Sequence, residues 1–307
     1  MKTISELIIE YTDSLTALRY SPLTVKKTRE HLERFCKYIR DICGISGTDR
    51  LTAEHMEQWH THLSSLCNLR GHPLKARTIN RHIGSIKGFV SWLADKGYCR
   101  QRLLTSLPYL KEPTRLPGNV LTHSQIREFL QKIPKDTPEG FRNRTMFEIL
   151  YTSGIRAGEL LGLDIIDNDI SSHTTRVTGK GNKERMVPLG KTALKHLETY
   201  VRAVRPFIIT DKNEKALFPG KDGKRLSYQA FRRIVVALSK SSGITFTAHT
   251  FRRSCATELI RSGANLYHVR ELLGHNSLAS LQPYVRLTVR DLKKTHKKCH
   301  PREKDEE

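Results

Sequence analysis

Residues suited to phosphate chemistry gather in the last part of this chain. His275 and Tyr284 stand nine residues apart, and the segment His-Thr-Phe-Arg upstream places His249 near Arg252. Histidine can move protons, arginine can neutralise phosphate oxygens, and tyrosine can supply a nucleophilic oxygen. We therefore expect a phosphodiester as the substrate.

The composition points to a polyanionic partner. The chain has 307 residues, with 53 lysines and arginines against 31 acidic residues and a formal net charge of +22. Such an excess favours nucleic acid first and an anionic membrane surface second, because each phosphate contact releases counterions. No stretch approaches the roughly 20 apolar residues of a spanning helix, so we expect no membrane partner.

The sequence offers no recognisable metal or nucleotide site. Its six cysteines form no Cys-x-x-Cys pair, which indicates reduced thiols in a cytoplasmic protein. The segment Gly190-Lys-Thr resembles the end of a P-loop, but Arg185 stands where the earlier glycine is needed. We expect chemistry without metal, nucleotide or other cofactor.

Two domains are predicted. Residues 1–108 are expected to be all helical, and the clearest helix covers 78–96, where apolar residues recur at steps of three and four. Pro108, Pro113 and Pro117 indicate a linker over 109–119, because proline disfavours helix before it. A second domain would then cover 120–307.

A DNA-binding surface is expected on the helix over 78–96 and its surroundings. Between Arg70 and Arg115 there are ten lysines and arginines and only two acids. This excess favours contact with phosphates through Arg77, Arg81 and Lys87. An ordinary solvated helix face is the alternative.

The second domain is predicted to be mainly helical with a small antiparallel sheet. Strands 175–178 and 183–187 are joined by a tight Gly-Lys-Gly-Asn hairpin over 179–182. Helices are expected over 145–151, 157–162, 191–205, 228–239, 250–262 and 265–273.

Five sequence blocks in this order identify a resemblance that spans nearly the whole chain. They are Thr-Ser-Gly-Ile-Arg156-Ala-Gly-Glu159-Leu-Leu-Gly-Leu, then Val-Thr-Gly-Lys180-Gly-Asn-Lys-Glu-Arg-Met-Val-Pro-Leu, then His249-Thr-Phe-Arg252, Leu-Leu-Gly-His275 and Tyr284. The chain resembles the tyrosine recombinase (phage integrase) family, most closely its Xer-like site-specific recombinases. The resemblance implies an all-helical, SAM-like DNA-binding domain followed by an α-rich catalytic domain with a small antiparallel sheet.

The resemblance assigns most catalytic roles. Arg156 and Arg252 would hold the non-bridging oxygens of the scissile phosphate, for which planar guanidinium groups are better suited than lysine. Tyr284 would be the nucleophile and His249 the base that receives its proton. His275 would add a hydrogen bond to the phosphate.

Two supporting roles leave alternatives. Lys180 resembles the family's general acid, which protonates the departing 5′ oxygen, and the nearby Lys183 is the alternative. Glu159 would lie beside Arg156 on a helix and hold its side chain. It could instead be an ordinary acid at a helix start.

The implied reaction is DNA strand transesterification without an external energy source. Partners implied by the resemblance are a double-stranded target site, a homo-tetramer on two duplexes or a related recombinase, and an accessory DNA-bending protein. Integration, excision, dimer resolution and inversion all remain open as natural tasks. Relaxation by a type IB topoisomerase and non-cleaving DNA regulation are the alternatives.

Overall fold

The computed structural model describes residues 2–99, 103, 106–112, 119–179, 181–274 and 281. The chain divides into two compact units, Met1–Thr114 and Arg115–Glu307. The predicted linker over 109–119 spans this division, and its residues 113–118 lie outside the described part of the chain. The predicted domain limits of 1–108 and 120–307 therefore stay predictions.

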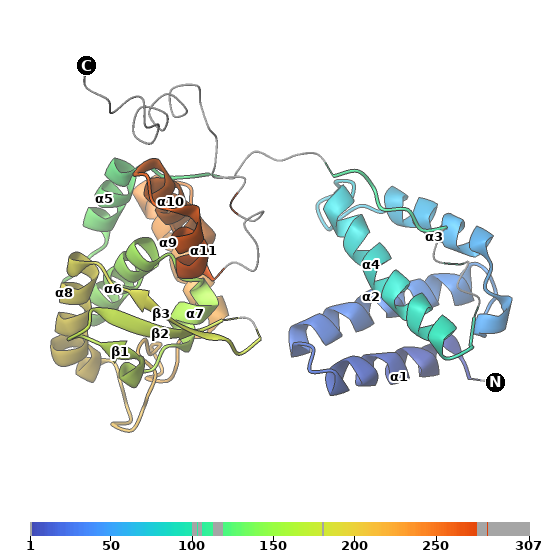
Figure 1. The fold of residues 1–307 in the computed structure, drawn as a ribbon, viewed down its shortest axis with the longest axis horizontal. Helices are drawn as coiled ribbons and strands as arrows, with labels where there is room; N and C mark the ends of the chain where they lie inside the picture. Colours follow the sequence, from blue (N-terminus) through green and yellow to red (C-terminus); the bar gives the residue numbers. More distant parts are fainter. Residues whose placement is uncertain are drawn as a thin grey trace, which may run out of the picture. The chain divides into compact units, whose positions relative to one another are not determined.

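The described part of the N-terminal unit is built from helices, as predicted (Figure 1). These are α1 (Ile4–Ala17), α2 (Pro22–Asp41), α3 (Ala53–Ser65) and α4 (Ala76–Asp95), with a 3₁₀ turn over Thr48–Arg50. Hydroxyl side chains begin three of the helices: Thr3, Ser21 and Thr52 each accept a hydrogen bond from a backbone N–H in the first turn. Such caps satisfy donors that a helix start leaves unpaired.

Helix α4 supplies the central apolar stripe of this unit. The five residues that predicted the helix are all buried: Ile79, Ile83, Ile86, Val90 and Leu93. They pack in one core with residues of α1, α2 and α3. The fully buried Trp59 of α3 meets Phe35 of α2 edge to face at 5.6 Å between ring centroids.

The predicted DNA-contact residues of α4 differ in exposure and in their contacts. Arg77 and Arg81 are exposed and four residues apart, so they lie on the same side of the helix. Lys87 is half-buried and its Nζ lies 4.7 Å above the ring of Tyr109. Arg77 contacts the same segment, since its Nε lies 3.9 Å from Oε2 of Glu112, so Arg77 and Lys87 both lie against residues 109–112.

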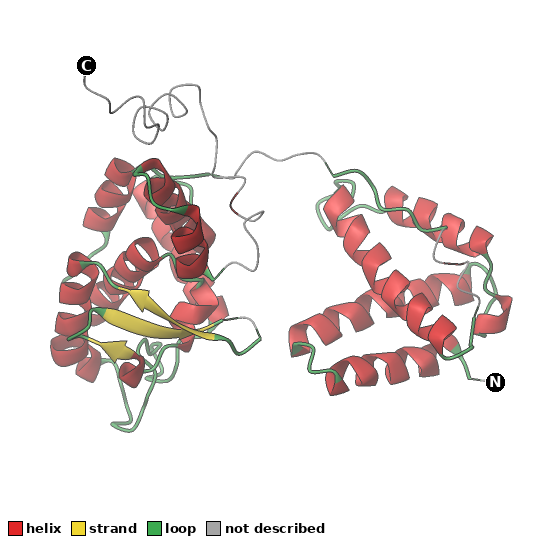
Figure 2. Cartoon of the chain, in the orientation of Figure 1, coloured by secondary structure: helices red, strands yellow, loops and turns green. Residues whose placement is uncertain are grey.

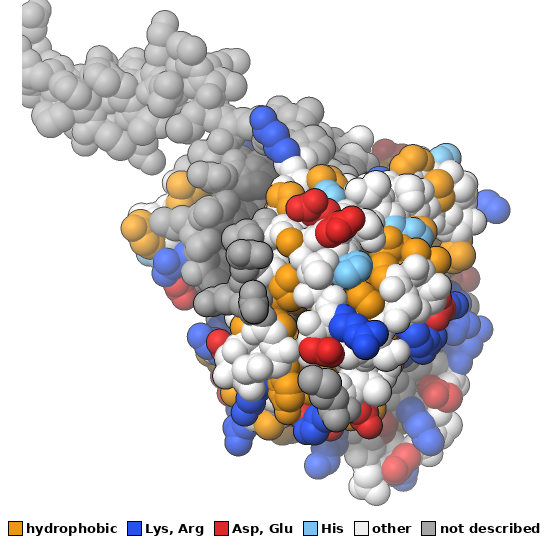
Figure 3. Space-filling view, turned by 90° about the vertical axis from the view of Figure 1, so that its right-hand side faces the viewer, with side chains coloured by type: hydrophobic (Ala, Val, Ile, Leu, Met, Phe, Trp, Pro, Cys, Tyr) orange, Lys and Arg blue, Asp and Glu red, His pale blue; other side chains and the backbone are white. Residues whose placement is uncertain are grey.

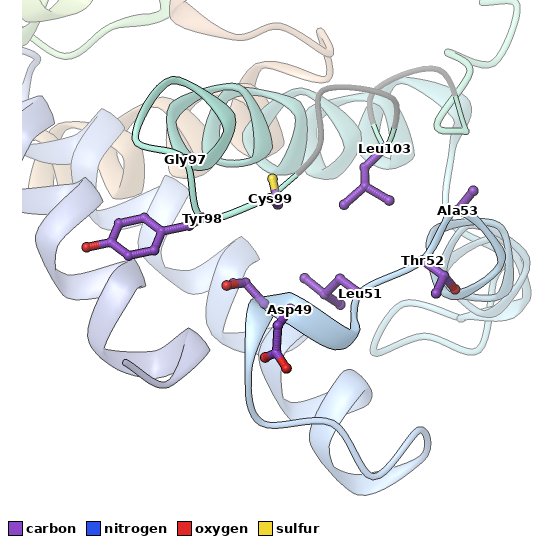
Figure 4. Close-up of a pocket in the computed structure, with 9 residues that line it drawn as sticks. Asp49, Leu51, Thr52, Ala53, Gly97, Tyr98, Cys99 and Leu103 are labelled. Carbon is purple, nitrogen blue, oxygen red and sulfur yellow. The ribbon is translucent and has the colours of Figure 1, made fainter. Parts of the chain in front are cut away.

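The face of the N-terminal unit drawn in Figure 3 carries charges of both signs. On the face drawn in Figure 3, basic and acidic side chains are interspersed with apolar residues and histidines. A cavity of about 470 Å³ lies between the 3₁₀ turn and the residues after α4, among Asp49, Leu51, Tyr98 and Cys99 (Figure 4). The described residues that line it include no lysine or arginine, so it offers no basic side chain to a phosphate.

The second unit places helices around a small antiparallel sheet (Figures 1 and 2). Its helices are α5 (His123–Lys132), α6 (Pro138–Ser153), α7 (Ala157–Gly162), α8 (Lys191–Thr199), α9 (Tyr228–Ser242), α10 (Ala248–Arg261) and α11 (Leu266–Leu273). Its strands are β1 (Asn168–Asp169), β2 (Thr174–Thr178) and β3 (Glu184–Pro188), hydrogen-bonded in the order β1-β2-β3. The predicted fold class is confirmed.

Two details differ from the sequence prediction. Strand β1 was not predicted, because two residues are too short to show alternation. The helix predicted over 191–205 changes type in its second half: α8 ends at Thr199, and a π-helical turn over Tyr200–Val204 and a 3₁₀ turn over Arg205–Phe207 follow. The side chains of Tyr200 and Arg205 donate to backbone carbonyls of residues 214–217, which fixes these irregular turns.

Helix α6 forms the centre of this unit. It is buried on nearly every side, so it carries no apolar stripe, and the sequence predicted only its second half. Its Phe147 packs against Phe251 of α10 with ring centroids 5.0 Å apart, and both rings are fully buried. This contact attaches α10 to the rigid core. No helix within the described residues combines the length and apolarity needed to cross a membrane.

The core of the N-terminal unit gives a matched test within one helix. Leu32 and Leu23 both lie in α2, but Leu32 is fully buried and Leu23 is 67% exposed. We expect Leu32→Ala to lower the free energy of unfolding by about 2–5 kcal/mol, because it leaves a cavity. Leu23→Ala should change it by less than about 0.5 kcal/mol. Urea unfolding of both variants measures the difference, and equal effects would contradict this packing.

Candidate active site

Arg156 stands at a sharp junction between two helices. Helix α6 ends at Gly154, whose φ of 63° is left-handed, and the fully buried Ile155 anchors the next residue. Arg156 then has extended backbone angles and serves as the N-cap of α7. Its side chain is 37% exposed, so the guanidinium reaches the surface from a fixed backbone.

Glu159 binds both the backbone and the side chain of Arg156. Its Oε2 accepts the backbone N–H of Arg156 at 2.8 Å, and its Oε1 accepts from Nη1 at 2.7 Å. The expectation that both residues lie on one helix needs correction, because Arg156 precedes the helix as its cap. The two alternatives for Glu159 are not exclusive: it is the acid of a helix start and also the partner of Arg156.

The predicted hairpin joins β2 and β3 as expected from its glycines and asparagine. Gly181 and Asn182 have φ of 77° and 58°, and the N–H of Gly179 donates to the carbonyl of Lys183 at 2.8 Å. Lys183 is exposed on this hairpin. Lys180 lies outside the described residues.

Helix α10 carries His249 and Arg252 one turn apart. His249 is the second residue of the helix and is exposed, whereas Arg252 is 3% exposed. Arg252 donates from Nη1 to the carbonyl of Gly154 at 2.7 Å and from Nη2 to that of Leu273 at 2.6 Å. The second arginine is therefore bound to the turn that precedes Arg156.

The last carbonyls of α11 bring three arginines together. Each carbonyl accepts a hydrogen bond from a different guanidinium, and we call this arrangement the α11 clamp. Its pairs are Arg185 Nε with Leu272 at 3.1 Å, Arg252 Nη2 with Leu273 at 2.6 Å and Arg156 Nη2 with Gly274 at 3.0 Å. A helix C-terminus carries partial negative charge, so it favours cations at this place.

Arg185 belongs to this site although the sequence analysis did not select it. It lies on β3 opposite Val177, and its Nη1 and Nη2 donate to Oε1 and Oε2 of Glu159 at 3.0 and 2.9 Å. One signal could have found it. In the strand pattern Arg185 shares a face with the buried Val187, and an arginine turned toward a core requires an acidic partner.

The charges of the site shift two pKa values. Burial alone would raise the pKa of Glu159, but hydrogen bonds from Arg185 and Arg156 outweigh it and hold the pKa below its usual value. Although His249 is solvent-accessible, desolvation by the surrounding protein lowers its pKa, and the charges of Arg252, Arg253 and Arg156 lower it further. His249 is thus mainly neutral at pH 7.

The remaining predicted site residues stand close in the sequence to these elements. Gly274, with a φ of 60°, ends α11 immediately before His275. His275 and Tyr284 lie outside the described residues, as does Lys180. Among the residues that the structure describes, no group of histidine, cysteine and acidic side chains could hold a metal ion.

Comparison with known proteins agrees with this geometry. The phage integrase family model matches residues 119–290, and the model of the phage integrase N-terminal SAM-like domain matches residues 8–97. The chain is 37% identical over 233 residues to the tyrosine recombinase XerD of Oceanobacillus iheyensis, which covers 73% of this chain and 76% of the relative. It is 36% identical over 230 residues to XerD of Listeria monocytogenes, with coverage of 74% and 77%.

Solved structures share the fold. The Tn1549 transposon integrase in complex with a circular intermediate DNA has a TM-score of 0.73 at 19% identity, covering 97% of this chain and 99% of that chain. The XerH recombinase bound to its difH substrate has a TM-score of 0.69 at 22% identity, covering 90% and 79%.

The fold and the arginine-rich site define a DNA strand-transferring enzyme. The chain belongs to the phage integrase family of tyrosine recombinases. It is an Xer-like, site-specific recombinase that transesterifies DNA strands.

Substitution of Glu159 tests the electrostatics of the site. In Glu159→Gln no carboxylate offsets Arg156 and Arg185, so we expect a loss of about 1–3 kcal/mol in the free energy of unfolding at pH 7. The pKa of Glu159 is lowered in the folded protein, so its contribution to the free energy of unfolding is complete above pH 4.5, the ordinary pKa of this carboxyl. The difference from the unsubstituted protein should shrink as the pH falls below 4.5 and Glu159 takes up a proton.

The exposed Glu184 of β3 provides the control. Urea unfolding of Glu184→Gln should give a free energy within about 0.5 kcal/mol of the unsubstituted protein. A Glu159→Gln variant that is equally stable at pH 7 would show that the carboxylate does not offset the arginine charges.

Proposed function

We propose that this recombinase cleaves and rejoins double-stranded DNA through a 3′-phosphotyrosyl bond to Tyr284. The α11 clamp is the observation that supports it most. One helix end binds Arg156 and Arg252, the chain enters His275 from the same end, and His249 lies one turn from Arg252. These are the groups that attack on a phosphodiester requires.

The proposed chemistry is a pair of exchanges at phosphorus. The oxygen of Tyr284 attacks the scissile phosphate, its proton passes to the neutral His249, and the bond from phosphorus to the 5′ oxygen breaks. Arg156, Arg252 and His275 stabilise the charge on the non-bridging oxygens. A 5′ hydroxyl from another strand then attacks the phosphotyrosyl bond and releases Tyr284.

The departing 5′ oxygen needs a proton, and the hairpin between β2 and β3 offers two lysines. We assign this role to Lys180, with Lys183 as the alternative. The sequence Gly-Lys-Gly-Asn supports the assignment, because Lys180 stands between Gly179 and Gly181 in the segment that joins β2 to β3. Gly179 itself lies close to the Glu159–Arg185 pair.

We further propose the partners of the reaction. A target duplex would be contacted by Arg77 and Arg81, with Lys87 in a lesser role because it stacks on Tyr109. A tetramer on two duplexes, or a pairing with a related recombinase, would supply the second strand, and an accessory DNA-bending protein would direct assembly. A lambda integrase dimer on its core site and XerH on difH support DNA as the partner.

Covalent trapping tests the proposed function. Nicked duplex fragments from the DNA around the gene are incubated with the protein in the absence of metal and ATP. The nick lets a short strand diffuse away, so the phosphotyrosyl bond cannot be reversed. We expect a protein-linked DNA band on a denaturing gel, and no such band with Tyr284→Phe.

The result also separates the alternative functions. Binding of the fragments without any covalent band would favour a non-cleaving regulator. Covalent bands on every fragment, together with relaxation of supercoiled DNA by a monomer, would favour a type IB topoisomerase. A band in Tyr284→Phe would contradict the assignment of the nucleophile.

The pH dependence of cleavage tests His249. Its pKa lies below the usual 6.5, so the neutral base should persist into mildly acidic solution. We expect the rate at sub-saturating DNA, which reports the free enzyme, to fall only below pH 6.5 as His249 gains a proton. His249→Gln should be slow at every pH and lack this transition. A transition at or above pH 6.5 would contradict the lowered pKa of His249.

A further inference from the structure

The guanidinium of Arg185 joins three parts of the site. Its Nη1 and Nη2 bind the two carboxylate oxygens of Glu159 at 3.0 and 2.9 Å, and its Nε binds the carbonyl of Leu272 at 3.1 Å. The side chain is 17% exposed and projects from β3. One planar group therefore connects the sheet to α7 and to the end of α11.

Arg185 completes the hydrogen bonding of Glu159. A carboxylate has about four acceptor positions. Two are used by the backbone and side chain of Arg156, and two by Arg185. Without Arg185, water would compete for half of the carboxylate, and the carboxylate plane that orients Arg156 would no longer be fixed.

The same pair lies against the backbone next to two catalytic positions. A Cβ atom on Gly274 would stand 3.0 Å from Cζ of Arg185. One on Gly179 would stand 3.3 Å from Oε1 of Glu159 and 3.4 Å from Nη1 of Arg185. Lys180 follows Gly179 and His275 follows Gly274, so the Arg185–Glu159 pair supports the chain immediately before both.

We infer that Arg185 is a positioning residue for strand cleavage: it locks Glu159 so that the guanidinium of Arg156 is held toward the scissile phosphate. The inference rests on the proposed function. Arg185 does not itself act as a phosphate ligand in this arrangement, because three of its five N–H groups are directed at Glu159 and Leu272. Its effect on the reaction passes through Arg156.

The test uses the DNA site that covalent trapping identifies. It compares the single-turnover cleavage rate and the DNA dissociation constant of Arg185→Gln and Arg185→Lys. We expect Arg185→Gln to cleave at least about tenfold more slowly, while its dissociation constant for DNA changes less than about threefold. Arg185→Lys should be intermediate, since lysine keeps the charge but lacks the fork. It also serves as the measurable variant if Arg185→Gln fails to fold.

Arg176 of β2 provides a matched control. It is an arginine on the neighbouring strand, and it binds Asp167 at 2.9 Å outside the site. Arg176→Gln removes a more exposed arginine–carboxylate pair on the adjacent strand. Its cleavage rate should stay within about twofold of the unsubstituted enzyme.

A second substrate separates positioning from general damage. A methylphosphonate at the scissile position lacks one anionic oxygen and so depends less on an oriented arginine. The deficit of Arg185→Gln should shrink to below about threefold on this substrate, because a defect in Arg156 matters only where charge must be neutralised. A distorted fold would slow both substrates alike.

Several outcomes would overturn the inference. They are equal deficits on the two substrates, loss of DNA affinity together with the rate, or an Arg185→Gln rate within about threefold of the unsubstituted enzyme on the phosphodiester. If the unsubstituted enzyme gives no more covalent product than Tyr284→Phe, the proposed function itself fails. That result is distinct from an enzyme that cleaves DNA but whose rate does not depend on Arg185.

Discussion

Three guanidinium groups lie against the C-terminal end of α11, and the arrangement of the catalytic unit depends on that contact. Like charges so close together repel one another, and the repulsion is offset by the buried carboxylate of Glu159 and by three backbone carbonyls with partial negative charge. The arginines come from a helix cap, a strand and a helix far apart in the sequence. The α11 clamp therefore connects the N-cap of α7, strand β3 and helix α10 to the end of α11.

Two kinds of feature could be predicted from the sequence: helices with a regular apolar repeat, and residues that stand in a recognisable motif. The apolar stripe of α4 predicted a helix. The sequence motifs indicated Arg156, His249 and Arg252 as candidate site residues, because the motifs occur in a characteristic order. The role of Arg185 was not predicted, since its partner Glu159 is 26 residues away and only folding brings them together. Helix α6 showed no period because it is buried all round, and the turns after α8 depend on distant carbonyls that bind Tyr200 and Arg205.

A cluster of buried aromatic rings packs the helices that carry the site. Phe129, Phe147, Phe246 and Phe251 form a cluster of fully or nearly fully buried rings between α5, α6 and α10. Gly154 follows α6, and a Cβ atom there would come 2.7 Å from Leu273 and 3.2 Å from Cys255. Its missing side chain lets the end of α6 approach the end of α11, so that its carbonyl can receive Arg252.

The α11 clamp also acts as a mechanical coupling. The three accepting carbonyls are consecutive and belong to one helix end, so a displacement of α11 reaches all of them at once. Displacing that helix end by a few tenths of an ångström lengthens the hydrogen bonds of all three arginines together. The three guanidinium groups therefore keep or lose their positions together, as one unit rather than as three independent side chains.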